Sequence, residues 1–173
     1  MGCSWYPPVR AGRLRLADMA PPAPPAPRLI AVNLAACLLL LVQFLLGMVA
    51  NLFVTLPAHH PGANASNYLA GVGSGVGWVI GQGPGWAAAH AALGLALAVA
   101  ALANVVFTWR RGSRLVIATA VLGALFIIGA GFNGASFVIY GHDTSSLIMS
   151  LLWALAVACY LAGLYLVARP LRR

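Results

Sequence analysis

Four long apolar segments, separated by polar stretches, make up most of the chain. They run from about residue 29 to 56, 86 to 109, 115 to 140 and 146 to 167. Each exceeds the roughly 20 residues that an α-helix needs to cross about 30 Å of hydrocarbon. The pattern therefore predicts an all-α polytopic membrane protein, an antiparallel bundle of four transmembrane helices.

The stretches between these segments contain signals for helix ends. Pro57 is expected to end the first helix, because proline cannot donate a backbone hydrogen bond. Asp143-Thr144-Ser145 has the composition of an N-cap before the fourth helix. The loop over residues 57–85 is long for a bundle, and loops of this size are often functional. Within it, we expect residues 66–82 to lie on the membrane surface as a short helix or lid.

Both ends of the chain differ in composition from the membrane domain at 29–167. Residues 1–28 form a tail rich in Pro, Ala and Arg, which is expected to be disordered and extended. Met19 offers an alternative start of translation within this tail. Residues 168–173 form a short basic tail.

The positive charges are confined to alternate connections. All ten are arginines, and none lies in the loop at 57–85 or in the turn at 141–145. They precede the first segment, separate the second from the third, and follow the fourth: Arg10, Arg13, Arg15, Arg28, Arg110, Arg111, Arg114, Arg169, Arg172 and Arg173. Because short cytoplasmic loops retain Arg and Lys, both termini are expected in the cytoplasm. The absence of lysine, with abundant Ala, Gly and Arg, indicates a GC-rich bacterial genome and hence a bacterial cytoplasmic (inner) membrane.

Composition narrows the range of partners. The chain is 62% apolar and 7% charged, whereas a soluble domain has about 25% charged residues. The net charge of +8 would suit a nucleic-acid binder. The arginines, however, are short clusters beside the membrane segments, where topology and anionic headgroups require them. The lipid bilayer is therefore the predicted partner and nucleic acid is not, while a homo-oligomer or a membrane-protein partner remains open.

Each predicted helix has a stripe of small and polar residues, which is typical of helix contacts within membranes. The stripes are Gln43, Gly47, Asn51 and Thr55; His90, Gly94, Leu97, Ala101, Asn104 and Thr108; Gly129, Asn133, Ser136 and Tyr140; and Met149, Trp153, Ala156, Tyr160 and Gly163. Several of their polar members lie roughly 6–10 Å below the outer helix ends, at 1.5 Å per residue. We therefore predict an outward-facing polar pocket around His90, lined by Gln43, Asn51, Asn133 and Ser136.

His90 is the main candidate for a functional residue, since an ionisable residue inside a membrane is by default a functional hypothesis. With His60, His142 or Met149 as a second axial ligand, it could hold a b-type haem. His59 and His60 together with His90 could instead hold Cu or Zn. The alternative is a structural histidine, hydrogen-bonded to Asn51 or to a loop carbonyl.

Two short motifs carry a resemblance. Val42-Gln43-Phe44-Leu45-Leu46-Gly47 and His90-Ala91-Ala92-Leu93-Gly94 resemble a family of small four-helix bacterial inner-membrane proteins of unknown function. The resemblance covers roughly residues 30–167 and implies a cytochrome-b-like helix pattern, in which haem is suspected. A further histidine commonly appears on helix four of that family. Helix four of this chain has none, which argues against ligation by two histidines within the membrane.

Three functions remain open, and none assigns a catalytic residue. The first is a membrane protein that binds haem or a metal ion around His90. The second is a non-catalytic accessory or partner-binding subunit without a cofactor, with the long loop as its contact. The third is a small oligomeric transporter or channel, which is disfavoured because the four segments contain no Asp or Glu for proton coupling. A thiol oxidoreductase is disfavoured too, since no C-x-x-C motif occurs.

Overall fold

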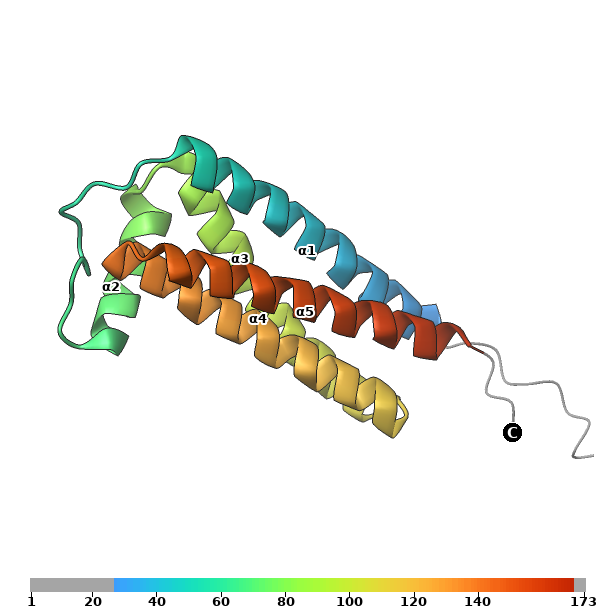
Figure 1. The fold of residues 1–173 in the computed structure, drawn as a ribbon. Coiled ribbons are helices and arrows are strands. Elements are labelled where there is room, and N and C mark those ends of the chain that lie inside the picture. Colours follow the sequence, from blue (N-terminus) through green and yellow to red (C-terminus); the bar gives the residue numbers. More distant parts are fainter. Residues whose placement is uncertain (1–26, 170–173) are drawn as a thin grey trace, which may run out of the picture.

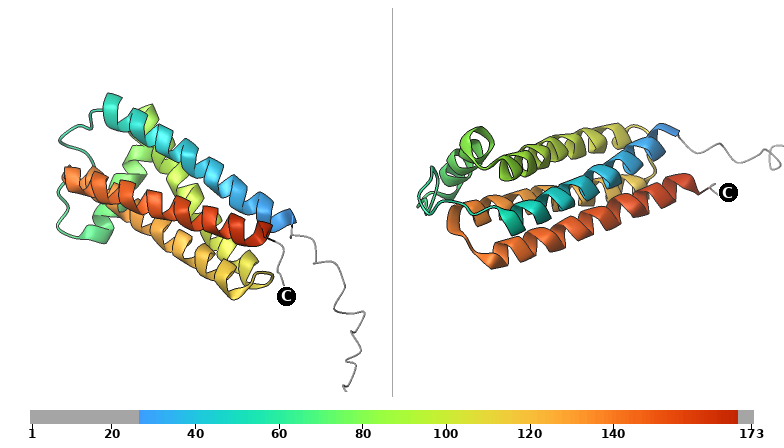
Figure 2. Two further views of the ribbon diagram at one scale, coloured as in Figure 1. Left: turned by 45° about the vertical axis from the view of Figure 1, so that its right-hand side comes forward. Right: turned by 90° about the horizontal axis from the view of Figure 1, so that it is seen from above.

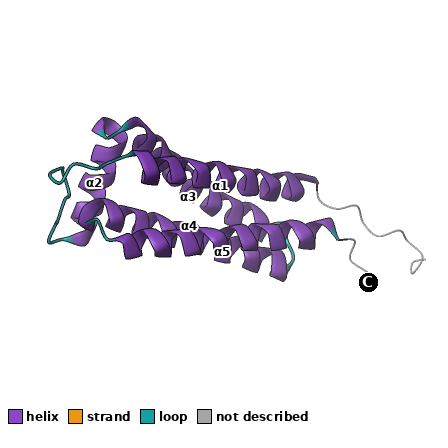
Figure 3. Ribbon diagram, turned by 45° about the horizontal axis from the view of Figure 1, so that its top comes forward, coloured by secondary structure: helices purple, strands orange, loops and turns teal. Residues whose placement is uncertain are grey.

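The computed structural model of the protein describes residues 27–169, and these residues contain helices and loops but no strand (Figure 3). The helices are α1 Pro27–Phe53, α2 Tyr68–Gln82, α3 Gly85–Trp109, α4 Arg114–Tyr140 and α5 Asp143–Ala168. Four of them, α1, α3, α4 and α5, are long and apolar enough to cross a membrane. The predicted all-α class and the four apolar helices are therefore confirmed. The alternative start at Met19, most of the N-terminal tail and the end of the basic tail lie outside the described residues.

Two predicted helix ends were wrong by a few residues. The first helix ends at Phe53 rather than at about 56, because Pro57 has no N–H to bond the Phe53 carbonyl four residues earlier and its ring would clash with that carbonyl in a helix. The fourth long helix begins at Asp143, with His142 as its N-cap residue. Asp143-Thr144-Ser145 therefore forms the first turn rather than the cap. A carboxylate in that turn interacts favourably with the helix dipole.

The short helix expected within residues 66–82 is present as α2. It begins after Asn67, whose side chain accepts a hydrogen bond from the Ala70 amide at 3.1 Å. Such N-caps satisfy one of the amides that the first helical turn leaves free. Figures 1 and 2 show α2 lying across one end of the long helices, where it packs on α3 and α4.

The four long helices lie side by side, and α1 and α5 bring Pro27 and Ala168 to the end opposite α2 (Figure 1). The described arginines and histidines are separated along this axis. Arg28, Arg110, Arg111, Arg114 and Arg169 belong to the helix ends remote from α2, whereas His59, His60, His90 and His142 belong to the ends near it. Arg111 and Arg169 each stack over an aromatic ring of their own segment. The separation seen in the sequence is thus a separation in space.

The core follows two of the four predicted stripes. Leu97, Ala101, Asn104 and Thr108 are buried along α3, and Ala156, Tyr160 and Gly163 along α5. The stripe predicted on residues 115–140 is half-buried at Gly129, Asn133 and Ser136 and exposed at Tyr140. There α4 buries Val116, Ala120, Gly123, Ala124, Ile127, Ala135 and Ile139, because it must face α3 and α5 on one side and α2 at its end. The stripe on the first segment also fails beyond Gly47, since Asn51 and Thr55 are exposed.

Candidate functional site

His90 is held by one residue, Gln43, across the contact between α3 and α1. Its Nδ1 lies 3.2 Å from the Gln43 backbone oxygen. The Gln43 amide Nε2 donates to the His90 backbone oxygen at 3.0 Å and lies 3.4 Å from the ring Nε2. A tautomer with the proton on Nδ1 satisfies all three contacts, because Nδ1 then donates and Nε2 accepts. Both ring nitrogens therefore meet atoms of Gln43.

Two glycines allow this close approach. A methyl group at Gly47 of α1 would lie 2.8 Å from Cε1 of the His90 ring. A methyl group at Gly94 of α3 would lie 3.0 Å from the Gln43 amide nitrogen. Each helix thus offers a glycine to the polar side chain of the other, four residues from its own polar side chain. We call Gln43, Gly47, His90 and Gly94 the α1–α3 lock.

His60 lies in a different part of the molecule. Its ring stacks on Trp78 of α2, with centroids 4.6 Å apart. Its Nε2 lies 3.1 Å from the Val138 backbone oxygen, and its Nδ1 lies 3.0 Å from the Pro61 oxygen. Val138 is in the last turn of α4, where helix carbonyls have no partner within the helix. His60 is therefore placed to cap α4.

The loop that follows His60 also forms hydrogen bonds with the end of α4. The Asn64 amide donates to the Ile139 oxygen at 2.9 Å, and the Tyr140 hydroxyl donates to the Ala65 oxygen at 3.2 Å. Gly62 has a φ of +88°, and a methyl group there would lie 2.7 Å from backbone atoms of α2. The loop at 60–65 thus fills the space between the end of α4 and α2.

The remaining predicted ligands are dispersed. His59 and His142 are exposed, and the His142 ring lies 6.0 Å from the Tyr140 ring. Met149 packs against Gly134 of α4, where an added methyl group would lie 3.1 Å from its sulfur. Within residues 27–169 no three His, Cys, Asp or Glu side chains are grouped so that they could hold a metal ion. The haem and metal sets proposed from sequence stay predictions.

The predicted pocket-lining residues also find separate partners. Asn133 donates to the Gly129 oxygen of its own helix at 2.9 Å. Ser136 bonds to the Phe132 oxygen at 3.0 Å and to the Tyr68 hydroxyl of α2 at 2.9 Å. Asn51 is exposed near the end of α1. Of the four, Gln43 is hydrogen-bonded to His90.

Sequence reasoning missed the aromatic residues that fasten the helices near the lock. The Trp153 indole of α5 donates to the Leu40 oxygen of α1 at 2.9 Å, and its ring stacks on Phe44 with centroids 4.6 Å apart. Tyr68 joins α2 to α4 through Phe132 and Ser136. A tryptophan on the predicted stripe of residues 146–167 was the available signal, since a buried indole N–H usually finds an acceptor.

A second polar cluster lies toward the opposite end. Asn104 of α3 is 6% exposed and Tyr160 of α5 is 1% exposed. The Asn104 Oδ1 accepts from Thr108 at 3.2 Å. The Asn104 Nδ2 and the Tyr160 hydroxyl have no hydrogen-bond partner among the described residues. Leaving a buried polar group unpaired costs about 1–3 kcal/mol.

Comparison with known proteins adds no family to this geometry. No family model matches the chain, and no curated protein or solved structure matches it significantly.

Proposed function

We propose that the chain is a multi-pass protein of a bacterial inner membrane, an antiparallel four-helix bundle with both termini in the cytoplasm. The separation of arginines from histidines along the bundle supports this orientation, because Arg is retained on the cytoplasmic side. The end that carries α2 and the 54–67 loop then faces outward.

Cysteine labelling in whole cells tests the orientation. Cys3, Cys37 and Cys159 are first replaced by alanine, and a single cysteine is then placed at Ala58 or at Gly112. A thiol reagent that cannot cross the inner membrane is expected to label the Ala58→Cys variant and not the Gly112→Cys variant. Labelling of the second variant alone would reverse the orientation.

Within this membrane domain, His90 serves structure rather than chemistry, and the protein acts as a non-catalytic, partner-binding subunit. The carrying observation is the α1–α3 lock, in which both ring nitrogens of His90 meet Gln43. A metal ligand needs one of those nitrogens free. The ring also lies against Gly47, so that no space for a porphyrin adjoins it on that side.

The partner we propose is an apolar helix that packs on α2, in another membrane protein or in a second copy of this chain. α2 has no charged residue. Gly71 and Gly75 face α4 and the loop, whereas Gly73, Gly77 and Gly81 have nothing within 4 Å of an added methyl group. Spaced four residues apart, these three glycines allow a second helix to approach closely. Leu69 and Ile80 flank them and are exposed.

Photo-cross-linking in intact membranes tests the partner. A benzophenone amino acid at Gly77 is expected to give one discrete adduct, whose mass identifies a second copy or a different protein. Gly131 of α4 is the matched control, because it is also exposed and also has nothing within 4 Å. Equal adducts from both positions, or none from Gly77, would contradict the proposal.

One observation favours the haem or metal reading as a second candidate. The His90 Nδ1 faces a backbone carbonyl, as ligating histidines usually do through their second nitrogen. If the Gln43 amide swung away, Nε2 would be free to bind an ion.

Oxidised and dithionite-reduced absorption spectra of the purified protein, with metal analysis of the same sample, separate the two candidates. The structural reading expects a flat visible spectrum and no stoichiometric metal. A Soret band that disappears in His90→Ala would overturn it.

A further inference from the structure

We propose that His60 is a proton-operated latch, which fastens the loop at 60–65 to the end of α4 when the imidazole is protonated and loosens it when the imidazole is neutral. Both ring nitrogens lie against backbone oxygens. Nε2 lies 3.1 Å from the Val138 oxygen, and Nδ1 lies 3.0 Å from the Pro61 oxygen. A carbonyl oxygen can only accept a hydrogen bond. Each nitrogen must therefore donate if both contacts are to be hydrogen bonds.

Only the imidazolium can donate from both nitrogens. A neutral imidazole has one N–H donor and one acceptor nitrogen. In either neutral tautomer, one ring nitrogen of His60 would turn its lone pair toward a carbonyl oxygen. His90 shows the opposite arrangement, since one of its nitrogens meets the Gln43 backbone oxygen and the other meets the Gln43 amide. The contacts of His90 suit the neutral ring, whereas those of His60 suit the protonated ring.

Two further features of its position favour a positive charge on His60. Val138 belongs to the last turn of α4, and the C-terminal end of a helix dipole attracts a cation. The His60 ring also stacks on Trp78 of α2, with centroids 4.6 Å apart and an angle of 12° between the planes. A cation over an indole face is attracted by the ring. Protonation therefore strengthens the contacts of His60 with α4 and with α2.

The charged groups near His60 do not compete with these contacts. α2 has no charged residue, and Arg114, the charged residue of α4, lies at the opposite end of that helix. His142 and Asp143 lie at the start of α5, which makes no contact with α2. His59 precedes His60 in the loop and is exposed. The other titratable groups of the two packing helices are tyrosines whose hydroxyls bond to backbone oxygens: Tyr68 and Tyr140.

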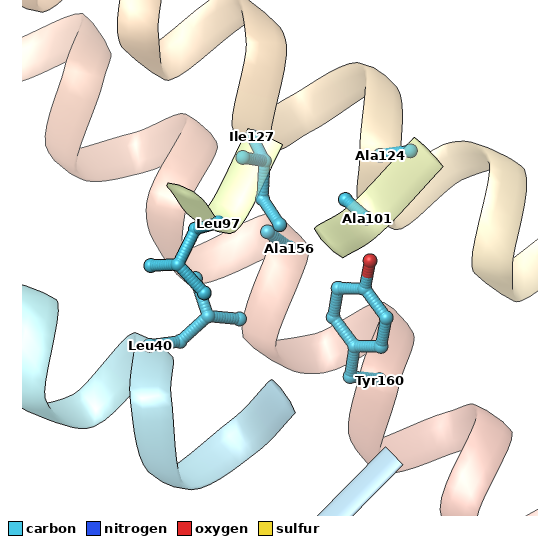
Figure 4. Packing of buried hydrophobic residues seen from close by; sticks show 7 residues of the cluster. All are labelled: Leu40, Leu97, Ala101, Ala124, Ile127, Ala156 and Tyr160. Carbon is cyan, nitrogen blue, oxygen red and sulfur yellow. The ribbon is translucent and has the colours of Figure 1, made fainter. Parts of the chain in front are cut away.

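The latch holds a segment that can move without opening the bundle. Beyond His60, the loop is fastened to α4 by the Asn64 amide and by the Tyr140 hydroxyl. The core cluster comes from the four long helices and contains no residue of the loop or of α2. Figure 4 shows its members: Leu40, Leu97, Ala101, Ala124, Ile127, Ala156 and Tyr160. Release of the loop therefore leaves this core in place.

Acid closes the latch. In the docked loop the imidazole has two carbonyl acceptors, whereas in a released loop it meets only water. The docked state therefore holds the extra proton more firmly, so docking strengthens as the pH falls and weakens as it rises. In the orientation proposed above, this end of the bundle faces outward and the latch responds to the pH outside the cell. The latch itself does not depend on that orientation.

Spin-label mobility in the full-length protein tests the latch. Cys3, Cys37 and Cys159 are replaced by alanine, and a nitroxide is attached to Ser66→Cys, at an exposed position directly after Ala65. In nanodiscs both faces meet the same buffer, so orientation does not affect the result. We expect the ratio of mobile to immobile label to rise about fivefold from pH 5 to pH 8, because histidine changes charge in this range and charge-assisted hydrogen bonds are the stronger ones. A ratio that does not change with pH would overturn the proposal.

Variants assign the response to one residue. His60→Gln is neutral at both pH values and is expected to keep the label mobile throughout. His59→Gln is the matched control in the same loop and is expected to keep the full response. Trp78→Leu removes the stacking partner and is expected to reduce the response without abolishing it. A response that persists in His60→Gln, or that disappears in His59→Gln, would contradict the assignment to His60.

Nitrogen NMR of histidine-labelled wild-type protein gives a second readout, which holds even if His60→Gln fails to fold. At about pH 5, where histidine is protonated, both ring N–H protons of His60 are expected to exchange slowly with water because both are hydrogen-bonded. Those of the exposed His59 are expected to exchange fast. Fast exchange from every protonated ring would overturn the proposal.

Discussion

The two ends of the α1–α3 contact treat buried polar groups in opposite ways. Near α2, Gln43 and His90 satisfy one another through three contacts, and a glycine lies beneath each side chain. Only the Gln43 Oε1 is left without a partner there. Toward the other end, Asn104 and Tyr160 border the same cavity, and a donor on each remains unpaired. The first end is built to hold two helices together, whereas the second leaves two donors buried without a partner among the described residues.

Among the substitutions that test this comparison, the largest loss of stability is expected at Tyr160. Tyr160→Ala removes a fully buried ring from the core cluster, and such truncations cost about 3–5 kcal/mol. Tyr160→Phe is expected to change the free energy of unfolding by less than about 1 kcal/mol, because its hydroxyl makes no hydrogen bond among the described residues. Denaturant unfolding in mixed micelles measures both. A loss above 2 kcal/mol in the phenylalanine variant would show that the hydroxyl is already paired.

A second effect is expected at the glycine beneath His90. Gly47→Val places side-chain atoms where the His90 ring now lies, and overpacking of this kind costs about 1–3 kcal/mol. Gly131→Val is the control on α4, since an added methyl group there meets nothing within 4 Å. The thermal midpoint should fall in the first variant only. Equal midpoints would mean that the ring is not held against α1.

A smaller but more decisive difference in stability is expected between substitutions of two side-chain amides, Gln43 and Asn104. Gln43→Leu removes the partner of His90 and should cost about 0.6–1.7 kcal/mol, the range measured for hydrogen bonds between membrane helices. Asn104→Leu removes an unpaired donor but also the acceptor of the Thr108 hydroxyl, so the free energy of unfolding should change by less than about 1 kcal/mol, because the two effects oppose one another. Both variants replace a side-chain amide by leucine, one on α1 and one on α3. Equal losses in ligand-free protein would erase the distinction between the two ends.

Much of the fold was predictable, because membrane helices follow from length and hydropathy alone. The four apolar runs and the short helix within residues 66–82 emerged as α1, α3, α4, α5 and α2. The helix ends were harder to predict, since Pro57 ends α1 four residues before the proline itself and His142 replaces Asp143 as the cap. Local sequence gives the signal for an end but not the residue at which the backbone turns.

The site was less predictable than the fold. Depth along a helix places Asn133 and Ser136 at the level of His90, yet both bond to carbonyls of their own helix. A carbonyl of the same helix is within reach of an Asn or Ser side chain. The depth of such a side chain along the helix therefore does not determine which group it bonds to. The pairing of Gln43 with His90 required knowledge of which helices adjoin. The cavity required it too, because Ala35, Ala36, Ala100 and Ala101 form a void only where α1 and α3 face each other.

The central claim is that His90 and Gln43 form a structural contact between α1 and α3. A double-mutant cycle with Gln43→Leu, His90→Ala and the double variant measures their coupling directly. We predict a coupling of about 0.6–1.7 kcal/mol in the free energy of unfolding, because either single change removes the side-chain contact at 3.4 Å between the Gln43 amide and the His90 ring. Strictly additive effects, with a coupling of zero, would contradict the account and return His90 to the list of residues free to bind a ligand.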